Sequence, residues 1–520
     1  MTATQRILLN IAATYGRALF ALVCGLFTGR WVLLSLGEVD YGLYGVVGGL
    51  TVFIGFLNSL LSGAVGRYYA VAVGEAKTSA SGLDTCRQWF NTAVLIHTVV
   101  PLLLMLIGYP IAEMAVRHWL TIPPDRIIDC LWVLRCTCVS CFVGMVTVPF
   151  QAMYIAKQYI AELTVYSFVT TVLNVCFLYY MVSHPGDWMV RFALWASLIS
   201  VAPQMIIAVR ALVVFPECAF RWTYLWSGSR LLALANYAGW QFFGNMGVLL
   251  RGQGLAILVN KYFGPAVNAS MTIANTVSGQ ASTLSGSLIG AFQPAIANAY
   301  GAGDLDGMRR LAYRACKFGT LLVLLFVIPL AAELPEVLRL WLKQPPRYAV
   351  ELCWCVLAVL VIDKTAVGHM LAVNARGKIA VYQAFLGTAL ILTLPLAWLW
   401  VALGGGVVAV GLSLVVTMAV CAWGRVFFAR KLVGMSARYW LFRIFLPLVA
   451  VSAVSGTAAW LPHLWMAPSL FRIIVATLCA EVLLLPLAWF LILDGAERRF
   501  IMDRVRALGC RLGIIRKGQP

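Results

Sequence analysis

Two long apolar segments joined by a short turn decide how this chain folds. Residues 233–263 read ALANYAGWQFFGNMGVLLRGQGLAILVNKYF, and residues 268–298 read NASMTIANTVSGQASTLSGSLIGAFQPAIAN, followed by AYGAGD. Each segment exceeds the ~20 residues that a helix needs to cross a bilayer. The first carries Arg251 deep in its apolar run, where a charge is costly enough to indicate a function. The stretch therefore predicts a pair of membrane-spanning helices with a functional cation.

The same stretch has a counterpart near the N-terminus, which predicts an internal repeat. At one constant shift, and without a gap, small and apolar residues of the two stretches coincide. The aligned pairs are Gly264 with Gly37, Leu288 with Leu61, Gly290 with Gly63, Ala291 with Ala64, Ala297 with Ala70, Ala299 with Ala72 and Gly301 with Gly74. We interpret the chain as two homologous halves of six spans, residues 1–211 and 233–430. An even number of spans gives both halves the same orientation, related by an axis along the membrane normal.

The composition indicates a membrane protein along most of its length. Of the 520 residues, 62% are hydrophobic and only 11% are charged, whereas a soluble protein carries roughly a quarter charged residues. The first apolar run is too long for a signal-peptide core, and no polar block offers room for a soluble catalytic domain. We predict an all-α polytopic fold with about fourteen spans. They lie near residues 12–35, 41–66, 89–109, 127–151, 159–183, 188–211, 233–262, 268–298, 317–342, 348–372, 378–401, 402–427, 442–462 and 469–493.

The distribution of basic residues predicts the orientation of these spans. The net charge is +19, and most of the basic residues fall on one side if both termini are cytoplasmic. The excess is therefore an orientation signal, and we expect no nucleic-acid partner. Residues 212–232, here called the linker, join the halves on the cytoplasmic side. Residues 431–494 add two spans, and residues 495–520 form a basic, amphipathic cytoplasmic tail that contacts anionic membrane lipids or stays solvated.

Five cations lie within the predicted spans, and two of them are the first candidates for a binding site. Each costs about 3 kcal/mol if it faces lipid at mid-bilayer. Arg17 and Arg251 share helical faces with small or polar residues, as a cavity wall requires, and the repeat places them on corresponding faces. Arg30 lies near the outer end of its span, where its side chain can reach the interface. The remaining cations are Arg135 and Lys364.

Asp363 is the carboxylate that the predicted spans place nearest mid-membrane. It is a candidate proton or cation-coupling site, and equally a candidate counter-ion for Arg135 or Arg251. Because adjacent helical residues point apart, we expect Asp363 and Lys364 not to pair with each other.

Enzyme signatures are missing from the sequence, so we expect a transporter. There is no phosphate-binding Gly-x-x-x-x-Gly-Lys loop, and the five histidines have no metal-ligand spacing. The fourteen cysteines have no framework spacing and are expected to pack inside helices, so no metal site is predicted. Glu38 and Asp40 are the carboxylates to consider for glycosyl transfer, but we interpret them as part of a short, hydrated outer turn.

Several motifs resemble a known group of transporters. Residues 37–45 read GEVDYGLYG and residues 62–70 read SGAVGRYYA, which is similar to the opening of bacterial polysaccharide and O-antigen flippases. Residues 262–268 (YFGPAVN), 292–296 (FQPAI) and 301–304 (GAGD) resemble the corresponding pattern of the multidrug/oligosaccharidyl-lipid/polysaccharide (MOP) exporter superfamily, which also contains MATE drug antiporters and lipid II flippases.

The resemblance implies a MATE-like fold with two six-helix lobes, a central cavity and alternating access. In the flippase branch the cavity is cationic and receives a lipid-linked pyrophosphate sugar. The implied function is translocation of an undecaprenyl-pyrophosphate-linked oligosaccharide to the outer leaflet of the bacterial inner membrane, for lipopolysaccharide or another surface polysaccharide. Arg17 and Arg251, assisted by Arg135 or Lys364, would bind the pyrophosphate. A polysaccharide polymerase is an expected partner.

Two other functions stay open at this point. A cation-coupled MATE-type multidrug antiporter shares the fold, but many such antiporters use an acidic residue in the first or seventh span, and this sequence has none there. A membrane glycan polymerase or ligase would need a large external loop, and the predicted external loops are small. No cofactor is expected, and energy would come from a proton or sodium gradient.

Overall fold

The computed structural model describes residues 52–76, 82–120, 122–184, 186–263, 265–342 and 345–499, together with residues 502–503 and scattered positions between 16 and 47. Within these residues every regular element is a helix. Ten of the described helices are long and apolar enough to cross a membrane. The prediction of an all-α polytopic membrane fold is therefore confirmed.

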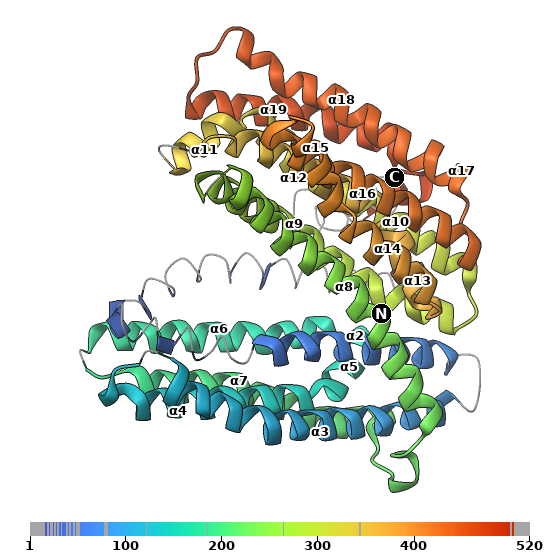
Figure 1. Cartoon of the computed structure of the whole chain (residues 1–520). Coiled ribbons are helices and arrows are strands. Elements are labelled where there is room, and N and C mark those ends of the chain that lie inside the picture. Colours follow the sequence, from blue (N-terminus) through green and yellow to red (C-terminus); the bar gives the residue numbers. More distant parts are fainter. Residues whose placement is uncertain are drawn as a thin grey trace, which may run out of the picture. The chain divides into compact units, whose positions relative to one another are not determined.

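The longer helices follow one another with short connections (Figure 1). In chain order they are α2 (Val52–Glu75), α3 (Gly82–Met114), α4 (Ile127–Val146), α5 (Val148–Ala156), α6 (Ile160–Ser183), α7 (Met189–Val214), α8 (Gly228–Phe263), α9 (Pro265–Gly301), α10 (Leu305–Ala332), α11 (Leu334–Leu342), α12 (Ala349–Thr365), α13 (Val367–Arg376), α14 (Ala380–Ile391), α15 (Thr393–Ala402), α16 (Gly406–Val433), α17 (Ala437–Trp440), α18 (Leu446–Trp460) and α19 (Leu470–Leu487).

Proline explains where two of the predicted spans are interrupted. A proline removes the hydrogen bond to the carbonyl four residues earlier and clashes with that turn. Pro149 follows the end of α4 at Val146, and Pro395 follows the end of α14 at Ile391. At the first break, the Thr147 amide and hydroxyl both donate to the Val143 carbonyl, at 3.0 and 2.8 Å, and close the last turn of α4. Each interrupted span thus continues as a second, short helix.

The described chain forms two compact units, of which unit 1 combines the first predicted half with segments of the second, whereas unit 2 lies entirely in the second half and the residues that follow it. Unit 1 comprises residues up to Met246, then Gly286–Ala312 and Leu371–Gly387. Unit 2 comprises Gly247–Ser285, Tyr313–Met370 and everything from Thr388 onward. The predicted domain boundaries themselves stay a prediction.

Unit 1 has an apolar core between α4, α6 and α7. Leu134, Leu178 and Met189 are almost completely buried there. The end of α9 also packs closely on α2, because Gly74 and Gly301 carry no side chain at the contact. A Cβ atom on Gly301 would lie only 2.0 Å from the Val71 carbonyl oxygen.

A buried arginine of α2 closes one end of α13 in the same unit. The Arg67 guanidinium donates to the carbonyls of Asn374 and Ala375 at 2.8 and 2.9 Å. These carbonyls end the helix, where the helix dipole favours a cation. Gly377 follows with φ +84°, and a Cβ atom there would lie 2.0 Å from the Arg67 guanidinium. The interaction therefore requires glycine at 377.

In unit 2, ionic contacts fasten α19 and the start of the tail to two points along the α10 region. At one end, Arg472 of α19 donates to both carboxylate oxygens of Glu333, at 2.9 Å each. Glu333 is fully buried and Arg472 is 8% exposed. Near the middle of α10, the Lys317 ammonium lies 3.1 Å from Glu497.

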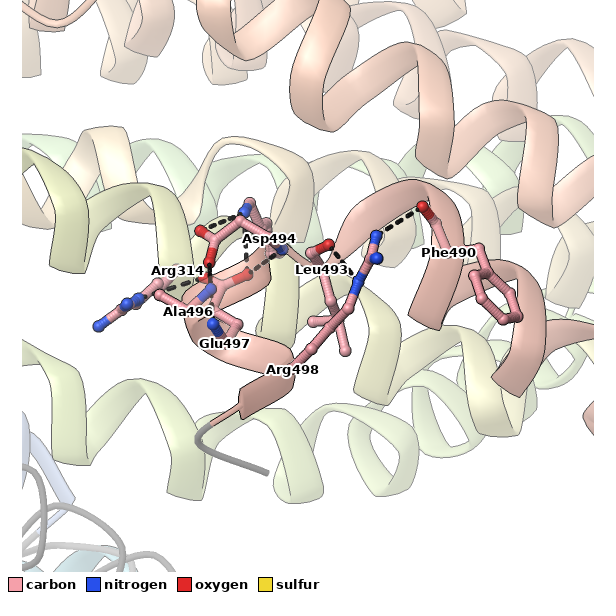
Figure 2. A network of polar contacts seen from close by, with 8 residues as sticks. Arg314, Phe490, Leu493, Asp494, Ala496, Glu497 and Arg498 are labelled. Atoms are coloured by element: carbon pink, nitrogen blue, oxygen red, sulfur yellow. Dashed lines mark hydrogen bonds and ion pairs between the residues drawn. The ribbon is translucent and has the colours of Figure 1, made fainter. Parts of the chain in front are cut away.

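Figure 2 shows that the Glu497 contact belongs to a helix start. Asp494 accepts from the Glu497 amide at 2.9 Å, and Glu497 accepts in return from the Asp494 amide at 3.0 Å. This reciprocal pair is a capping box, which fixes the first turn of a helix. Arg314 adds a contact to Glu497 at 3.2 Å. The start of the tail is therefore held firmly against α10.

Candidate functional site

A cluster of charged side chains lies inside unit 2, between the end of α12 and α16. The Asp363 carboxylate accepts from Lys364 at 2.8 Å and from Arg425 at 2.8 Å. Arg425 also donates to the Asp363 main-chain carbonyl at 3.1 Å. The side chains of Asp363, Lys364 and Arg425 are 22%, 12% and 10% exposed. The three side chains are thus largely shielded from solvent and lipid.

The expectation that Asp363 and Lys364 would not pair is wrong. They lie in the last turn of α12, which ends at Thr365. Because the helix ends one residue later, no following turn of α12 restricts the Lys364 side chain. This long, flexible side chain can therefore bend back to the carboxylate of its neighbour. Arg425, rather than Arg135 or Arg251, makes the direct hydrogen bonds to Asp363.

Arg251 lies close to this cluster on α8. Its guanidinium interacts electrostatically with Asp363, with Arg425 and with the Cys421 thiol. The side chain is mostly buried, and its NH1 nitrogen is buried without a hydrogen-bond partner among the described residues. A buried donor without a partner carries the full cost of its lost hydration. Arg251 is therefore able to donate to a group that the described residues do not supply.

The cluster contains more positive than negative charge. Arg251, Lys364 and Arg425 are cations and Asp363 is an anion, so the four residues carry two excess positive charges. Excess charge in a low-dielectric interior is costly unless an opposite charge binds. The arrangement can accept a doubly negative anion, with Arg251 as its free donor.

The neighbouring side chains enclose the cluster with neutral groups. The indole of Trp440 donates to the Thr365 carbonyl at 2.8 Å. The Cys316 sulfur accepts from the Gly368 amide at 3.2 Å and lies 3.6 Å from Nδ1 of His369. His369 is fully buried. In the part of the chain that the structure describes, no group of His, Cys, Asp and Glu has the arrangement of a metal site.

The other two predicted cations belong to unit 1. Arg135 is exposed on α4, where it donates to the Tyr109 hydroxyl at 3.2 Å and lies 5.4 Å from the Trp132 ring centre. Arg17 is helical and exposed. Their proposed contact with pyrophosphate stays a prediction. Arg30 and Glu38 lie outside the described residues.

Sequence analysis missed Arg425 as a site residue. It lies near the end of the predicted span 402–427, and its position beside a run of basic residues assigned it to a cytoplasmic border. A signal was present, because α16 continues as one helix to Val433 and places Arg425 two turns inside it. Helix length, rather than local hydropathy, would have found it.

The outer turn with Asp40 also differs from expectation. Asp40 is buried, with 9% of its surface exposed, whereas a hydrated turn was expected. Its carboxylate lies 3.1 Å from the Arg126 guanidinium. Arg126 binds Asp129 and Asp187 as well, at 2.9 and 2.6 Å. The hydrogen bond from Arg126 lowers the pKa of Asp187, whereas burial raises the pKa of Asp40. These contacts explain Asp40 as part of a structural ion-pair network.

Comparison with solved structures identifies the fold. No protein-family model matches the chain, and no curated protein matches it. The chain is similar to a MOP superfamily transporter from Pyrococcus furiosus, described as having a binding pocket of reverse polarity, with a TM-score of 0.64 and 13% identity over 84% of this chain and 96% of that one. The chain has the fold of the MOP exporter superfamily.

Two MATE structures support the same assignment. An outward-facing multidrug resistance MATE transporter of the MOP superfamily has a TM-score of 0.66 at 13% identity, covering 84% of this chain and 96% of that one. A MATE structure in the bent conformation has a TM-score of 0.66 at 14% identity, covering 87% and 98%. Since the solved chains are covered almost completely, this MOP-fold protein contains the whole of their architecture and additional residues. It is a multi-pass membrane protein.

Proposed function

We propose that this MOP-fold protein is a flippase that moves an undecaprenyl-pyrophosphate-linked oligosaccharide from the inner to the outer leaflet of a bacterial inner membrane. The supporting observation is the charge of the cluster around Asp363, in which Lys364 and Arg425 bind the carboxylate and Arg251 lies within electrostatic range of it. A pyrophosphate diester carries two negative charges, which matches this excess. A cationic path lowers the cost of moving the headgroup through the bilayer because it replaces lost hydration.

Each residue has a defined role in this proposal. Arg251 donates to the pyrophosphate from its unpartnered nitrogen, and Arg425 and Lys364 supply the remaining charge. Arg17 and Arg135 contact the same headgroup at another stage of transport. The oligosaccharide crosses in the protein while the lipid chain stays in the bilayer, and a surface-polysaccharide polymerase takes up the product. Asp363 couples transport to a proton or sodium gradient. The bound anion competes with Asp363 for Lys364 and Arg425, and an Asp363 carboxylate that loses these two cations can take up a proton or a sodium ion instead.

The test measures binding of a pyrophosphate lipid to the purified full chain in detergent. We expect R251A and R425A each to weaken binding about tenfold or more, which corresponds to losing ~1.4 kcal/mol. R251K retains part of the affinity because it keeps the charge without the forked geometry. R339A is the matched control, because Arg339 is 65% exposed on α11 and lies outside the cluster. Equal affinity in all four variants contradicts the proposal.

A multidrug antiporter is the second candidate, because two of the similar structures are described as MATE structures. The excess positive charge disfavours it, since cationic drugs would be repelled. Deletion of the gene separates the two functions. A flippase loss removes surface polysaccharide and leaves sensitivity to cationic dyes unchanged, whereas loss of a drug antiporter has the opposite effect.

A further inference from the structure

The linker between α7 and α8 is fixed to the rest of unit 1 along α3. The buried side chain of Asn91 accepts from the Arg221 amide at 2.8 Å and donates to the Ala219 carbonyl at 3.0 Å. Arg87 donates to the Pro216 carbonyl at 3.1 Å. In Figure 1 the linker is the green segment that extends outward past α3 at the lower right. These bonds give the linker a defined inner and outer side.

The inner side of the linker is closed and the outer side is aromatic. Phe215 and Cys218 are 3% and 0% exposed, whereas Phe220, Trp222 and Trp226 are 47%, 80% and 77% exposed. Such large apolar side chains lose free energy in contact with water. Because the backbone is held by α3, the linker cannot turn its rings inward without breaking the Asn91 bonds.

The exposed rings continue the apolar surfaces of the adjoining spans. At the end of α7, Leu212 and Val213 are 51% and 82% exposed, and at the start of α8 Leu232 is 71% exposed. Both helices are long and apolar enough to cross a membrane. A tryptophan that directly follows a lipid-facing helix end lies at the depth of the headgroups, where its ring and N–H are both accommodated.

The charge of the linker agrees with the same surroundings. Arg221 is exposed, and its guanidinium lies 5.7 Å from the Tyr224 ring centre. In the chain it follows the buried Cys218 and directly precedes the exposed tryptophans. Basic side chains near the membrane surface are attracted by anionic lipids. We propose that the linker is a lipid-binding site, in which Trp222 and Trp226 insert into the headgroup region and Arg221 contacts the phosphate of an anionic phospholipid.

The proposal assigns the linker a role that its position between the predicted halves does not suggest. A hydrated hinge would leave the rings in water and would give α7 and α8 independent motion. A lipid-bound linker instead keeps the end of α7, the start of α8 and the Asn91 turn of α3 at one depth. It holds whether the transported molecule is a lipid-linked sugar or a drug.

The experiment locates the two rings relative to lipid and water. The full chain is labelled with 5-fluorotryptophan and placed in nanodiscs of phosphatidylcholine and phosphatidylglycerol, and the W222F and W226F variants assign the two fluorine signals. We expect a headgroup nitroxide lipid to broaden both signals several-fold more than a soluble gadolinium chelate does. Signals that are broadened by the chelate and not by the nitroxide lipid overturn the proposal, because the rings then lie in water. A surface that a protein partner covers in cells would give this result.

Two controls keep the result specific. Trp240 lies inside α8, about 18 Å along the helix from its start at Gly228, so its signal should be broadened less by either reagent. The anionic part is tested with R221Q, which should reduce the lipid broadening in nanodiscs that contain phosphatidylglycerol but not in phosphatidylcholine alone. If broadening is the same with and without phosphatidylglycerol, and unchanged in R221Q, the phosphate contact is wrong.

Discussion

At the scale of single residues, Arg425 holds the candidate site together. It bonds both to the carboxylate and to the main-chain carbonyl of Asp363, so it links α16 to the end of α12. Lys364 reaches only the carboxylate. The two cations are therefore not equivalent, and the geometry assigns a structural role to Arg425 in addition to its charge.

Replacing Arg425 should lower stability as well as anion binding. In R425Q the buried Asp363 keeps one cation and loses the other, and we expect a cost of about 2 kcal/mol, less than for a carboxylate left alone. The measurement is the thermal unfolding of the purified chain in detergent. K364Q should cost less, because Arg425 still bonds Oδ1 and the main-chain carbonyl of Asp363, and only Oδ2 loses its partner. A larger loss in K364Q than in R425Q would show that the roles are reversed.

Glycine 377 provides a second prediction at this scale. G377A introduces a Cβ atom that would lie 2.0 Å from the Arg67 guanidinium, at a backbone φ of +84°. Displacing Arg67 leaves a buried cation without its carbonyl acceptors, so we expect a loss of about 2 kcal/mol or more. G66A on α2 is the control, since no atom lies within 4 Å of its Cβ position. Comparable unfolding temperatures for the two variants would contradict the interpretation.

At the scale of helices, the attachment of α19 to α10 depends on Glu333 and Arg472. We expect E333Q to cost about 3–5 kcal/mol because it leaves Arg472 buried and uncompensated. The double variant E333L/R472M should recover much of this loss, since apolar side chains of similar size can replace a buried pair. Thermal unfolding of the single and double variants checks this. A double variant as unstable as E333Q would mean that the pair is needed for more than mutual neutralisation.

Acid should release the first turn of the tail before it unfolds the protein. Burial favours the neutral form of Asp494, but the Glu497 amide and the charge of Lys317 outweigh it and lower the pKa of Asp494. A lowered pKa means that the stabilisation is present above the ordinary value, about 3.9 for aspartate, and is lost as the pH falls through the folded value. Hydrogen exchange of the amides around Ala496 should rise below about pH 4. In D494A, which lacks the accepting oxygen, exchange should be fast already at neutral pH and change little with acid.

The sequence predicted the membrane helices better than it predicted the side-chain contacts between them. Apolar runs predicted the membrane helices because their length and composition are local properties. The sequence alone did not predict the helix ends before Pro149 and Pro395, because proline can also lie inside a continuous helix, as Pro101 and Pro110 do in α3. The partners of Arg425, Glu333 and Glu497 could not be predicted, because each pairs with a residue far away in the chain, and nothing in a hydropathy pattern encodes which helices become neighbours.

At the scale of the whole chain, the repeat and the compact units give different divisions. The end of α9 lies in the second predicted half, but it packs on α2 of the first. Asn298 of α9 donates to the Ala156 carbonyl at the end of α5, at 2.9 Å. Arg67 makes a comparable contact from α2 to α13. If the halves move against each other during transport, these contacts have to break.

The packing of α9 on α2 can be tested with one methyl group. In G301A the new Cβ atom meets the Val71 carbonyl at 2.0 Å, and a backbone atom cannot give way as a flexible side chain does. We expect α9 to separate from α2, so that a cysteine introduced at Asn298, which is 5% exposed in the native chain, reacts several-fold faster with a membrane-impermeant maleimide. G290A on the same helix is the matched control, because its Cβ atom has no neighbour within 4 Å. Equal labelling in the two backgrounds would mean that this contact does not hold the helices together, and the separation required for transport would then have to be sought at Arg67 and α13.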